Sequence, residues 1–311
     1  EPCSRGVIEA QPCPRALGRE IPAAQRRWVL AACVLASSMA FIDGSALTVA
    51  LPVLRTELDA DIAAVQWVIN SYMLALAALT LVGGSLADLY GKARILAVGC
   101  GLFAVASIAC ALAPSIDWLI AARFAQGTGA ALLTPASLAL IGATYPRGER
   151  NRAISIWAAA SALTTAGGPL LGGWLTETFG WPAIFWINPP LAVLTIALLR
   201  AFAPPDRRLD RRFDLTGAVI LSLGLALVAW ALSEIGPGEV AAEEVDGPPI
   251  GAILLVGAFG LLALLAFVLW QRRTQHPMTP PRLAANTTFV GLNVATLLVY
   301  AALAMMLFLL P

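Results

Sequence analysis

IGAILLVGAFGLLALLAFVLW, the sequence of residues 250–270, decides the fold class because it contains no charged residue over the length of a membrane span. A helix rises about 1.5 Å per residue, so about 20 apolar residues cross a hydrocarbon core about 30 Å thick. Comparable apolar stretches occur at Trp28–Leu54, Val65–Ala87, Ile95–Ala113, Ile116–Ala143, Ile154–Leu175, Pro182–Phe202, Asp214–Ile235 and Thr288–Leu310. The sequence therefore predicts an all-α membrane protein with about nine transmembrane helices.

The composition of the whole chain supports this interpretation. Of its 311 residues, 59% are hydrophobic and only 13% are charged, whereas soluble domains carry about 25% charged residues. The formal net charge is +1, and the basic residues are spread over several loops instead of forming one stripe. This distribution argues against a nucleic-acid partner and leaves the lipid bilayer as an expected partner.

Charged residues in the connecting segments predict the orientation. Apart from Arg55 and Arg123, every Lys and Arg lies in the N-terminal tail or in every second loop, and the alternate loops are acidic. Short basic loops stay in the cytoplasm, so we expect a multi-pass protein of the cell membrane (plasma or inner membrane) with a cytoplasmic N-terminus. On this basis the cytoplasmic positions include Lys92, Arg150 and Arg208, and the external positions include Glu57, Glu177 and Glu243.

Loop length and loop composition divide the chain into parts. Short connections join the first six helices, which are expected to pack as one bundle. The missing initiator Met and the end of the chain at Pro311 lead us to expect a piece of a longer protein. The predicted parts are a cytoplasmic tail (1–27), an N-terminal six-helix bundle (28–203), a cytoplasmic linker (204–213), a central helix pair (214–270), a second cytoplasmic linker (271–287) and a last helix (288–311).

Two charged residues lie inside the predicted spans. Asp43 sits midway along the first helix, and Arg123 lies a turn or two inside the fourth. A charge near the bilayer centre costs about 2.5–3.5 kcal/mol on insertion scales, so both side chains are expected to face a cavity, a partner or water. A carboxylate in an apolar cavity takes up a proton more readily than one in water, which would let Asp43 carry protons. Asn70 and Gln126 are weaker signals, because amides also join helices by ordinary hydrogen bonds.

Each charged residue also has a structural interpretation. The carboxylate of Asp43 would then accept backbone N–H bonds at a helix break near Gly44. Arg123 would snorkel to the membrane surface or serve as a hydrogen-bond hub. At the level of the sequence both alternatives stay open.

Glycine and proline carry further information in two of the predicted helices. The run Gly167-Gly168-Pro169-Leu170-Leu171-Gly172-Gly173 lies inside the fifth apolar stretch. Proline removes a helical hydrogen bond, and glycines allow a neighbouring helix to approach closely. A packing notch in a static bundle is the alternative interpretation of this run. A second group closes the second helix and begins the third: Gly84, Asp88, Gly91, Lys92 and Arg94.

These motifs resemble those of the major facilitator superfamily. The stretch Gly84–Arg94 is similar to the signature loop of that family, although Leu89 and Ala93 replace basic residues. Leu119–Ala131 resembles its fourth-helix motif, whose arginine, Arg123 here, is associated with proton coupling. The Gly-Pro run resembles its antiporter motif, with Thr164 and Ser155 at the positions of two upstream glycines.

Other stretches narrow the resemblance to the drug:proton antiporters with fourteen helices. The layout is similar to theirs, with six helices, an extra central pair and the opening helix of a second bundle. Residues 288–311 would then be the first helix of a truncated C-terminal bundle, and the resemblance runs from about Trp28 to Pro311. In the first helix, Ser45 and Thr48 depart from the usual Thr and Asn. The stretches that carry this resemblance are Ile42–Pro52, Gln66–Tyr72 and Phe185–Pro190.

The resemblance implies a secondary transporter of the major facilitator fold, in which two bundles expose a midplane site alternately to each side. Proton entry would drive the export of amphipathic, often cationic, compounds, with no cofactor besides the proton gradient. The proton-coupling and substrate site would comprise Asp43, Arg123, Asn70 and Gln126. The cytoplasmic gate would comprise Gly84, Asp88, Gly91, Lys92 and Arg94, and the seam between the bundles Gly168, Pro169, Gly172 and Gly173.

Two other functions stay open at this level. One is a facilitator-fold importer of a small solute, and the other is a truncated membrane protein that does not transport. An enzyme or a metal centre is not expected, since the predicted spans hold no paired carboxylates and the chain has a single histidine, His276. The expected partners are a small amphipathic substrate, protons, lipid and the missing C-terminal half, with no nucleic acid.

Overall fold

In the computed structural model the described residues are 21–206, 213–234, 249–274, 277–278 and 286–309. Most of the predicted tail (1–27), parts of the predicted linkers (204–213 and 271–287) and the loop after the seventh apolar stretch therefore lie outside the described residues. Arg208, Glu243 and His276 belong to those segments. The predicted division of the chain at these linkers stays a prediction.

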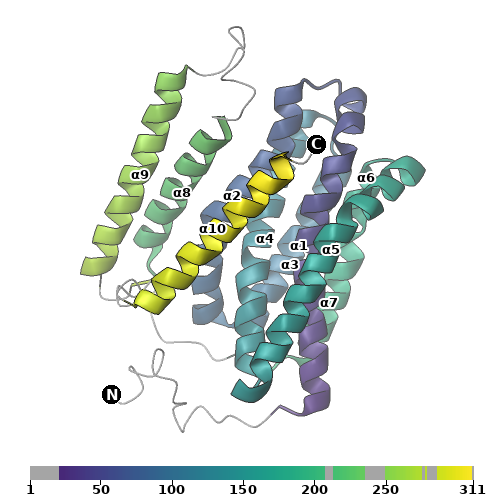
Figure 1. The fold of residues 1–311 in the computed structure, drawn as a ribbon. Coiled ribbons are helices and arrows are strands. Elements are labelled where there is room, and N and C mark those ends of the chain that lie inside the picture. The colour runs from purple at the N-terminus through teal and green to yellow at the C-terminus, as the bar shows by residue number, and fades with distance from the viewer. Residues whose placement is uncertain (1–20, 207–212, 235–248, 275–276, 279–285, 310–311) are drawn as a thin grey trace.

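The described part of the chain is helical throughout and contains no strand. Each of the nine predicted apolar stretches corresponds to a helix, except that the sixth is divided in two (Figure 1). The helices are α1 (Ala23–Glu57), α2 (Ile62–Tyr90), α3 (Lys92–Ala111), α4 (Ile116–Thr144), α5 (Arg147–Phe179), α6 (Pro182–Trp186), α7 (Asn188–Phe202), α8 (Leu215–Glu234), α9 (Ile250–Arg273) and α10 (Thr287–Leu309).

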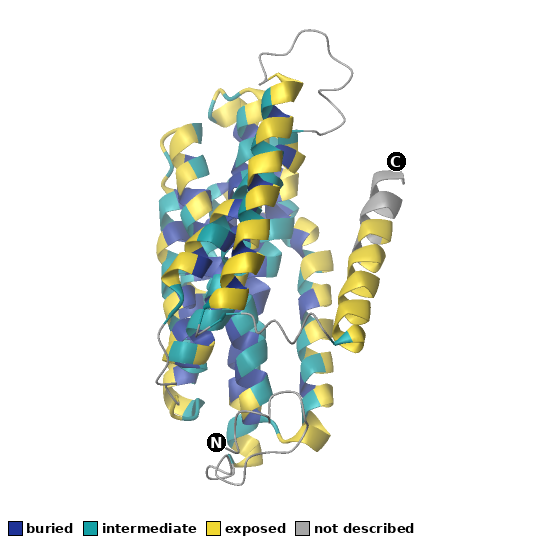
Figure 2. Cartoon of the chain, turned by 90° about the vertical axis from the view of Figure 1, so that its left-hand side faces the viewer, coloured by how far each residue is buried: buried dark blue, intermediate teal, exposed yellow. Residues whose placement is uncertain are grey.

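Eight helical stretches of the described chain are long and apolar enough to cross a membrane, with α6 and α7 together forming one of them. The ninth predicted span is α10, whose described side chains from Thr287 onward are exposed. Figure 2 shows α10 along one side of the molecule, outside the main bundle. The structure thus confirms an all-helical membrane protein.

Local sequence signals explain where several helices begin and end. The Asp61 carboxylate accepts a hydrogen bond from the Ala64 N–H at 2.7 Å and caps α2. Short polar side chains often pair in this way with the free backbone N–H groups at the start of a helix. Gly91 separates α2 from α3 with a φ of 108°, a conformation that glycine adopts readily and other residues do not. The structure thus confirms that this group of residues closes the second helix and begins the third.

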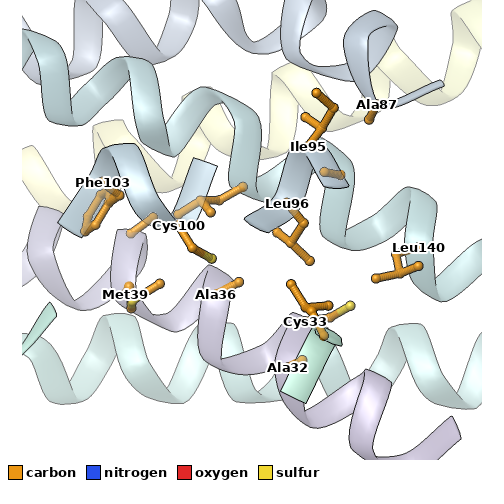
Figure 3. Packing of buried hydrophobic residues seen from close by; sticks show 14 of the residues in the cluster. Ala32, Cys33, Ala36, Met39, Ala87, Ile95, Leu96, Cys100, Phe103 and Leu140 are labelled. Atoms are coloured by element: carbon orange, nitrogen blue, oxygen red, sulfur yellow. The ribbon is translucent and has the colours of Figure 1, made fainter. Parts of the chain in front are cut away.

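Helices α1 to α7 pack around two buried apolar clusters. Figure 3 shows part of the larger cluster, in which α1 and α3 face one another through Cys33, Ala36, Leu96 and Cys100. Small residues bring the neighbouring helices close. A Cβ atom at Gly83 would collide with the Ala131 carbonyl oxygen, so α2 and α4 approach to backbone contact.

The central pair of helices forms a hairpin that lies against α2. Helices α8 and α9 approach closely at Gly224 and Gly260. A Cβ atom at Gly260 would lie 3.0 Å from the Gly224 oxygen. The Asp214 carboxylate, just before α8, accepts hydrogen bonds from Trp270 Nε1 at 3.0 Å and Gln271 Nε2 at 2.8 Å. These bonds fix the start of α8 to the end of α9, and Figure 1 shows the two helices side by side.

The structure excludes one of the open alternatives and corrects one expectation. Helix α1 continues through Gly44 without interruption, so Asp43 does not cap a helix break. The sixth apolar stretch is interrupted at Ile187, between α6 and α7. The reason is local: Pro189 and Pro190 have no N–H to donate to the preceding turn.

Candidate functional site

A buried ion pair lies at the centre of the bundle. The Asp43 carboxylate of α1 contacts the Arg123 guanidinium of α4 through Oδ2 and Nη1, and each residue is only 1% exposed. These two are the only buried charged residues in the described part of the chain. Charges taken out of water must be paired to be tolerated, so the pairing explains how both can lie within apolar helices.

A ring of hydrogen bonds surrounds the carboxylate. Gln126 Nε2 donates to Asp43 Oδ1 and to Ser107 Oγ, both at 2.8 Å. Asn188 Nδ2 lies 3.2 Å from the same two oxygen atoms. The four side chains come from α1, α3, α4 and α7, and all are at most 1% exposed. One carboxylate oxygen thus accepts two amide N–H bonds while the other accepts from Arg123.

Arg123 has further partners that do not carry charge. Its Nε donates to the Val68 carbonyl oxygen at 3.2 Å, and its Nη1 donates to Gln126 Oε1 at 2.6 Å. Its Cζ atom lies 4.2 Å from the centre of the Tyr72 ring and 5.9 Å from that of Phe185. A cation over an aromatic face gains about 2 kcal/mol or more when it is desolvated. Arg123 is therefore held in place even without its bond to Asp43.

The structure brings together three of the four residues predicted for this site. Asp43, Arg123 and Gln126 are bonded to one another, whereas Asn70 is half-buried on α2 and outside the network. Sequence reasoning missed Ser107 and Asn188. Asn188 did give a signal, because it is an amide inside an apolar stretch next to two prolines, but Ser107 gave none.

The residues of the predicted gate gather where α2 joins α3. Asp88 and Lys92 form an exposed ion pair at 3.1 Å. The carboxylate of Asp206, which follows α7, accepts bonds from the backbone N–H groups of Ala93 at 3.1 Å and Arg94 at 2.8 Å. Asp206 thereby caps α3, and a Cβ at Gly91 would collide with it.

Gly84 is not the glycine that allows α2 to approach α4. A Cβ at Gly84 would meet only the Pro135 Cβ at 3.6 Å, which is ordinary contact, whereas the adjacent Gly83 lies directly against α4. Within this bundle the close packing of α2 on α4 is made by Gly83. A role of Gly84 toward a second bundle stays a prediction.

The Gly-Pro run of α5 packs against α1. Cβ atoms at Gly168 and Gly172 would collide with Ser45 and with the Ala46 backbone. These two glycines were expected at a seam between bundles, and the structure places them at a seam inside this one. Gly173 and Pro169 lie to the side, and the opposite face of α5 is exposed, with Leu170 at 80%.

Among the described residues no group of His, Cys, Asp or Glu is arranged to hold a metal ion. The chemistry available to the site is that of its ion pair and its amide groups. They can exchange a proton or accommodate a positive charge at Asp43.

A family model described as the Major Facilitator Superfamily matches residues 33–311, which is most of the chain. The chain belongs to the Major Facilitator Superfamily. The motifs that carried the resemblance are spread over the same region of the sequence, so the superfamily assignment agrees with them.

Curated relatives resemble this chain at 31–40% identity. A puromycin resistance protein of Streptomyces alboniger is 38% identical over 268 residues, which are 85% of this chain and 51% of that protein. A cephamycin export protein of Amycolatopsis lactamdurans is 40% identical over 81% of this chain and 52% of its own length. The chain spans about half the length of the curated relatives it matches.

Solved structures of the superfamily share the fold. A peptide transporter, POT, in complex with sulfate aligns with a TM-score of 0.58 at 18% identity, over 82% of this chain and 55% of that one. An inward-facing bacterial homolog of the human lysosomal transporter Spinster aligns with a TM-score of 0.51 at 22% identity, over 82% of this chain and 63% of that one. These likenesses extend to the fold alone.

Proposed function

We propose that the protein containing this chain is a proton-coupled antiporter that exports amphipathic, chiefly cationic, drugs or toxic compounds. The observation that carries the proposal is the buried pair of Asp43 and Arg123, the only buried charges of the described helices. Relatives that carry the names of antibiotic resistance and export proteins support it.

Antiport follows from competition for one carboxylate. In these hydrogen bonds Asp43 is always the acceptor, as a charged carboxylate is. A proton or a cationic compound can each bind to that carboxylate, but both together cannot. Binding of one therefore promotes release of the other, and alternating access assigns the two events to opposite sides of the membrane.

Arg123 provides the fixed part of the site. Its bonds to Val68 and Gln126 and its contact with the Tyr72 ring involve uncharged groups, so they persist when Asp43 takes up a proton. The guanidinium then leaves a net positive charge within the bundle. That charge repels a cationic substrate and completes the exclusion.

The remaining assignments belong to the same proposal. Asp88, Lys92 and their neighbours lock the cytoplasmic end against a second bundle, which the other half of the protein supplies. The protein lies in the cell membrane with its N-terminus inside. It works without a cofactor, draws its energy from the proton gradient and performs no enzymatic reaction.

Proton flux in everted vesicles tests both the coupling and its direction. Vesicles with an acidic interior and the full-length protein are exposed to an amphipathic cationic dye while a pH indicator reports on the medium. Antiport acidifies the medium, since protons leave as dye enters the lumen. Uptake of dye together with protons, as a solute importer would show, makes the medium more alkaline and contradicts the proposal.

A further inference from the structure

Asn188 lies at an interruption of the helical hydrogen bonds of a membrane span, where the backbone of Ile187 keeps helical angles (φ −65°, ψ −34°). It is the first residue of α7, is 1% exposed, and follows the interruption at Ile187. Pro189 and Pro190 next to it have no N–H groups, so the carbonyl groups of the preceding turn lack their helical partners. Residues 182–202 nevertheless form one span. Side-chain bonds at Asn188 therefore help to hold the two halves of that span in place.

The bonds of Asn188 are shared with a second amide. Asn188 Nδ2 and Gln126 Nε2 donate to the same two acceptors, Asp43 Oδ1 and Ser107 Oγ. The bonds from Gln126 measure 2.8 Å and those from Asn188 measure 3.2 Å. Gln126 is also held by Arg123, at 2.6 Å. Of these two donors, Asn188 is therefore the more weakly held.

We propose that Asn188 is a positioning residue that ties the α6–α7 interruption to α1 while Asp43 is charged and releases it when Asp43 is protonated. This inference rests on the proposed proton uptake at Asp43. A hydrogen bond to a charged acceptor is about twice as strong as one between neutral groups. Proton uptake at Oδ1 turns that oxygen into a hydroxyl, which donates its own proton and accepts fewer bonds, so Oδ1 no longer serves both amide donors. The longer bond breaks first, and the start of α7 is released from α1.

Three other ionisable groups lie around Asp43. Arg123 of α4, Tyr72 of α2 and Cys110 of α3 face it electrostatically. Tyrosine, cysteine and arginine ordinarily titrate well above neutral pH. Helices α5, α6 and α7 bring no ionisable side chain between Arg152 and Arg200 except Glu177, which is exposed at the far end of α5.

Infrared difference spectroscopy of the full-length protein in lipid nanodiscs tests the bond. The carbonyl band of a protonated carboxylic acid, assigned to Asp43 by its loss in Asp43→Asn, is followed as the pH falls. Asn188→Ala removes a donor that favours the charged form, so the midpoint of the band should move to higher pH by about one unit. Thr195→Val is the matched control, because Thr195 is buried on α7 but bonds only to Leu191 of its own helix. An unchanged midpoint in Asn188→Ala overturns the inference.

Hydrogen exchange of the backbone at residues 183–191, corrected for the intrinsic effect of pH, tests the release. In the parental protein and in Thr195→Val, exchange should rise as Asp43 becomes protonated. In Asn188→Ala it should be high at every pH, and Asn188→Ser, which keeps a shorter donor, should lie between them. If hydrogen exchange in both Asn188 variants depends on pH as it does in the parental protein, the proposal is contradicted. Failure to detect any protonated Asp43 would instead overturn the proton step of the proposed function, and this inference with it.

Discussion

The carboxylate of Asp43 and the guanidinium of Arg123 join α1 to α4 through an ion pair in which both residues are 1% exposed. A pair so fully removed from water behaves differently from a surface salt bridge. Removing one partner leaves a buried charge without compensation, which costs about 3–5 kcal/mol. Substitutions at either residue are therefore expected to have large and separable effects.

Asp43→Asn should abolish proton-driven export by the full-length protein, because asparagine keeps the size and hydrogen bonding of the side chain but carries neither proton nor charge. We expect export of a dicationic dye to fall to the background level of cells that lack the protein. Dye efflux from energised cells measures it. Asp117→Asn, at an exposed carboxylate of α4, is the control and should export normally. Normal dication export by Asp43→Asn would assign Asp43 a structural role.

Arg123→Lys should also fail, although the charge is conserved. The single nitrogen of an ammonium group cannot take the positions of two guanidinium nitrogens, of which Nε donates to Val68 and Nη1 donates to Gln126 and Asp43. We expect loss of transport together with a lower midpoint of thermal unfolding in nanodiscs. Arg200→Lys changes an exposed arginine on α7 and should alter neither quantity. Parental transport by Arg123→Lys would show that charge alone suffices at this position.

Two substitutions of Tyr72 can distinguish its ring contact with Arg123 from its hydroxyl bond to Ala40. Its ring lies 4.2 Å from the Arg123 Cζ atom, and its hydroxyl donates to the Ala40 oxygen at 3.3 Å. Tyr72→Phe keeps the ring and should lower the unfolding free energy by about 0.5–1.5 kcal/mol with transport retained. Tyr72→Leu should cost about 2 kcal/mol more and impair transport. The measurements are the unfolding free energy and the dye export of both variants. If the two variants do not differ in either, the cation–π contact does not contribute to transport.

The sequence was sufficient to predict the helices and the central pair of charges. An apolar stretch of span length is costly to expose to water, and a charged side chain inside such a stretch is costly unless it has a partner. It did not predict which polar residues share one site. Asn188 and Asp43 are 145 positions apart, and their meeting depends on how α7 is rotated about its axis. The same reason explains Asn70, which the sequence placed in the site and the structure places outside the network.

Two adjacent glycines also show that the sequence does not predict which residue of a helix faces which neighbour. Successive residues of a helix point about 100° apart, so Gly83 and Gly84 face different neighbours. The motif draws attention to Gly84, whereas the contact with α4 is made at Gly83. No periodic signal in α2 decides between them, because both faces of that helix are apolar.

The orientation of the chain is tested by single cysteines in a version without its five native cysteines. A membrane-impermeant thiol reagent added to intact cells should label the acidic loops and leave the basic loops unlabelled until the cells are opened. The positions to compare are Glu57, Glu177 and Glu243 outside, and Lys92, Arg150 and Arg208 inside. Labelling of Arg208→Cys in intact cells would reverse the assignment.

The glycines of α5 provide a matched pair for testing the seam with α1. A Cβ at Gly172 would lie 2.5 Å from the Ala46 oxygen and 2.8 Å from the Ala46 Cα, both backbone atoms that cannot move aside cheaply. A Cβ at Gly167 would meet nothing within 4 Å. Gly172→Ala should therefore push α5 from α1 and destabilise the protein by about 1–3 kcal/mol. Gly167→Ala should be neutral or stabilising by up to about 1 kcal/mol, because alanine favours the helix. Thermal unfolding of both variants in nanodiscs decides the matter. If Gly172→Ala and Gly167→Ala unfold at the same temperature, α1 and α5 do not approach as closely as the described structure places them.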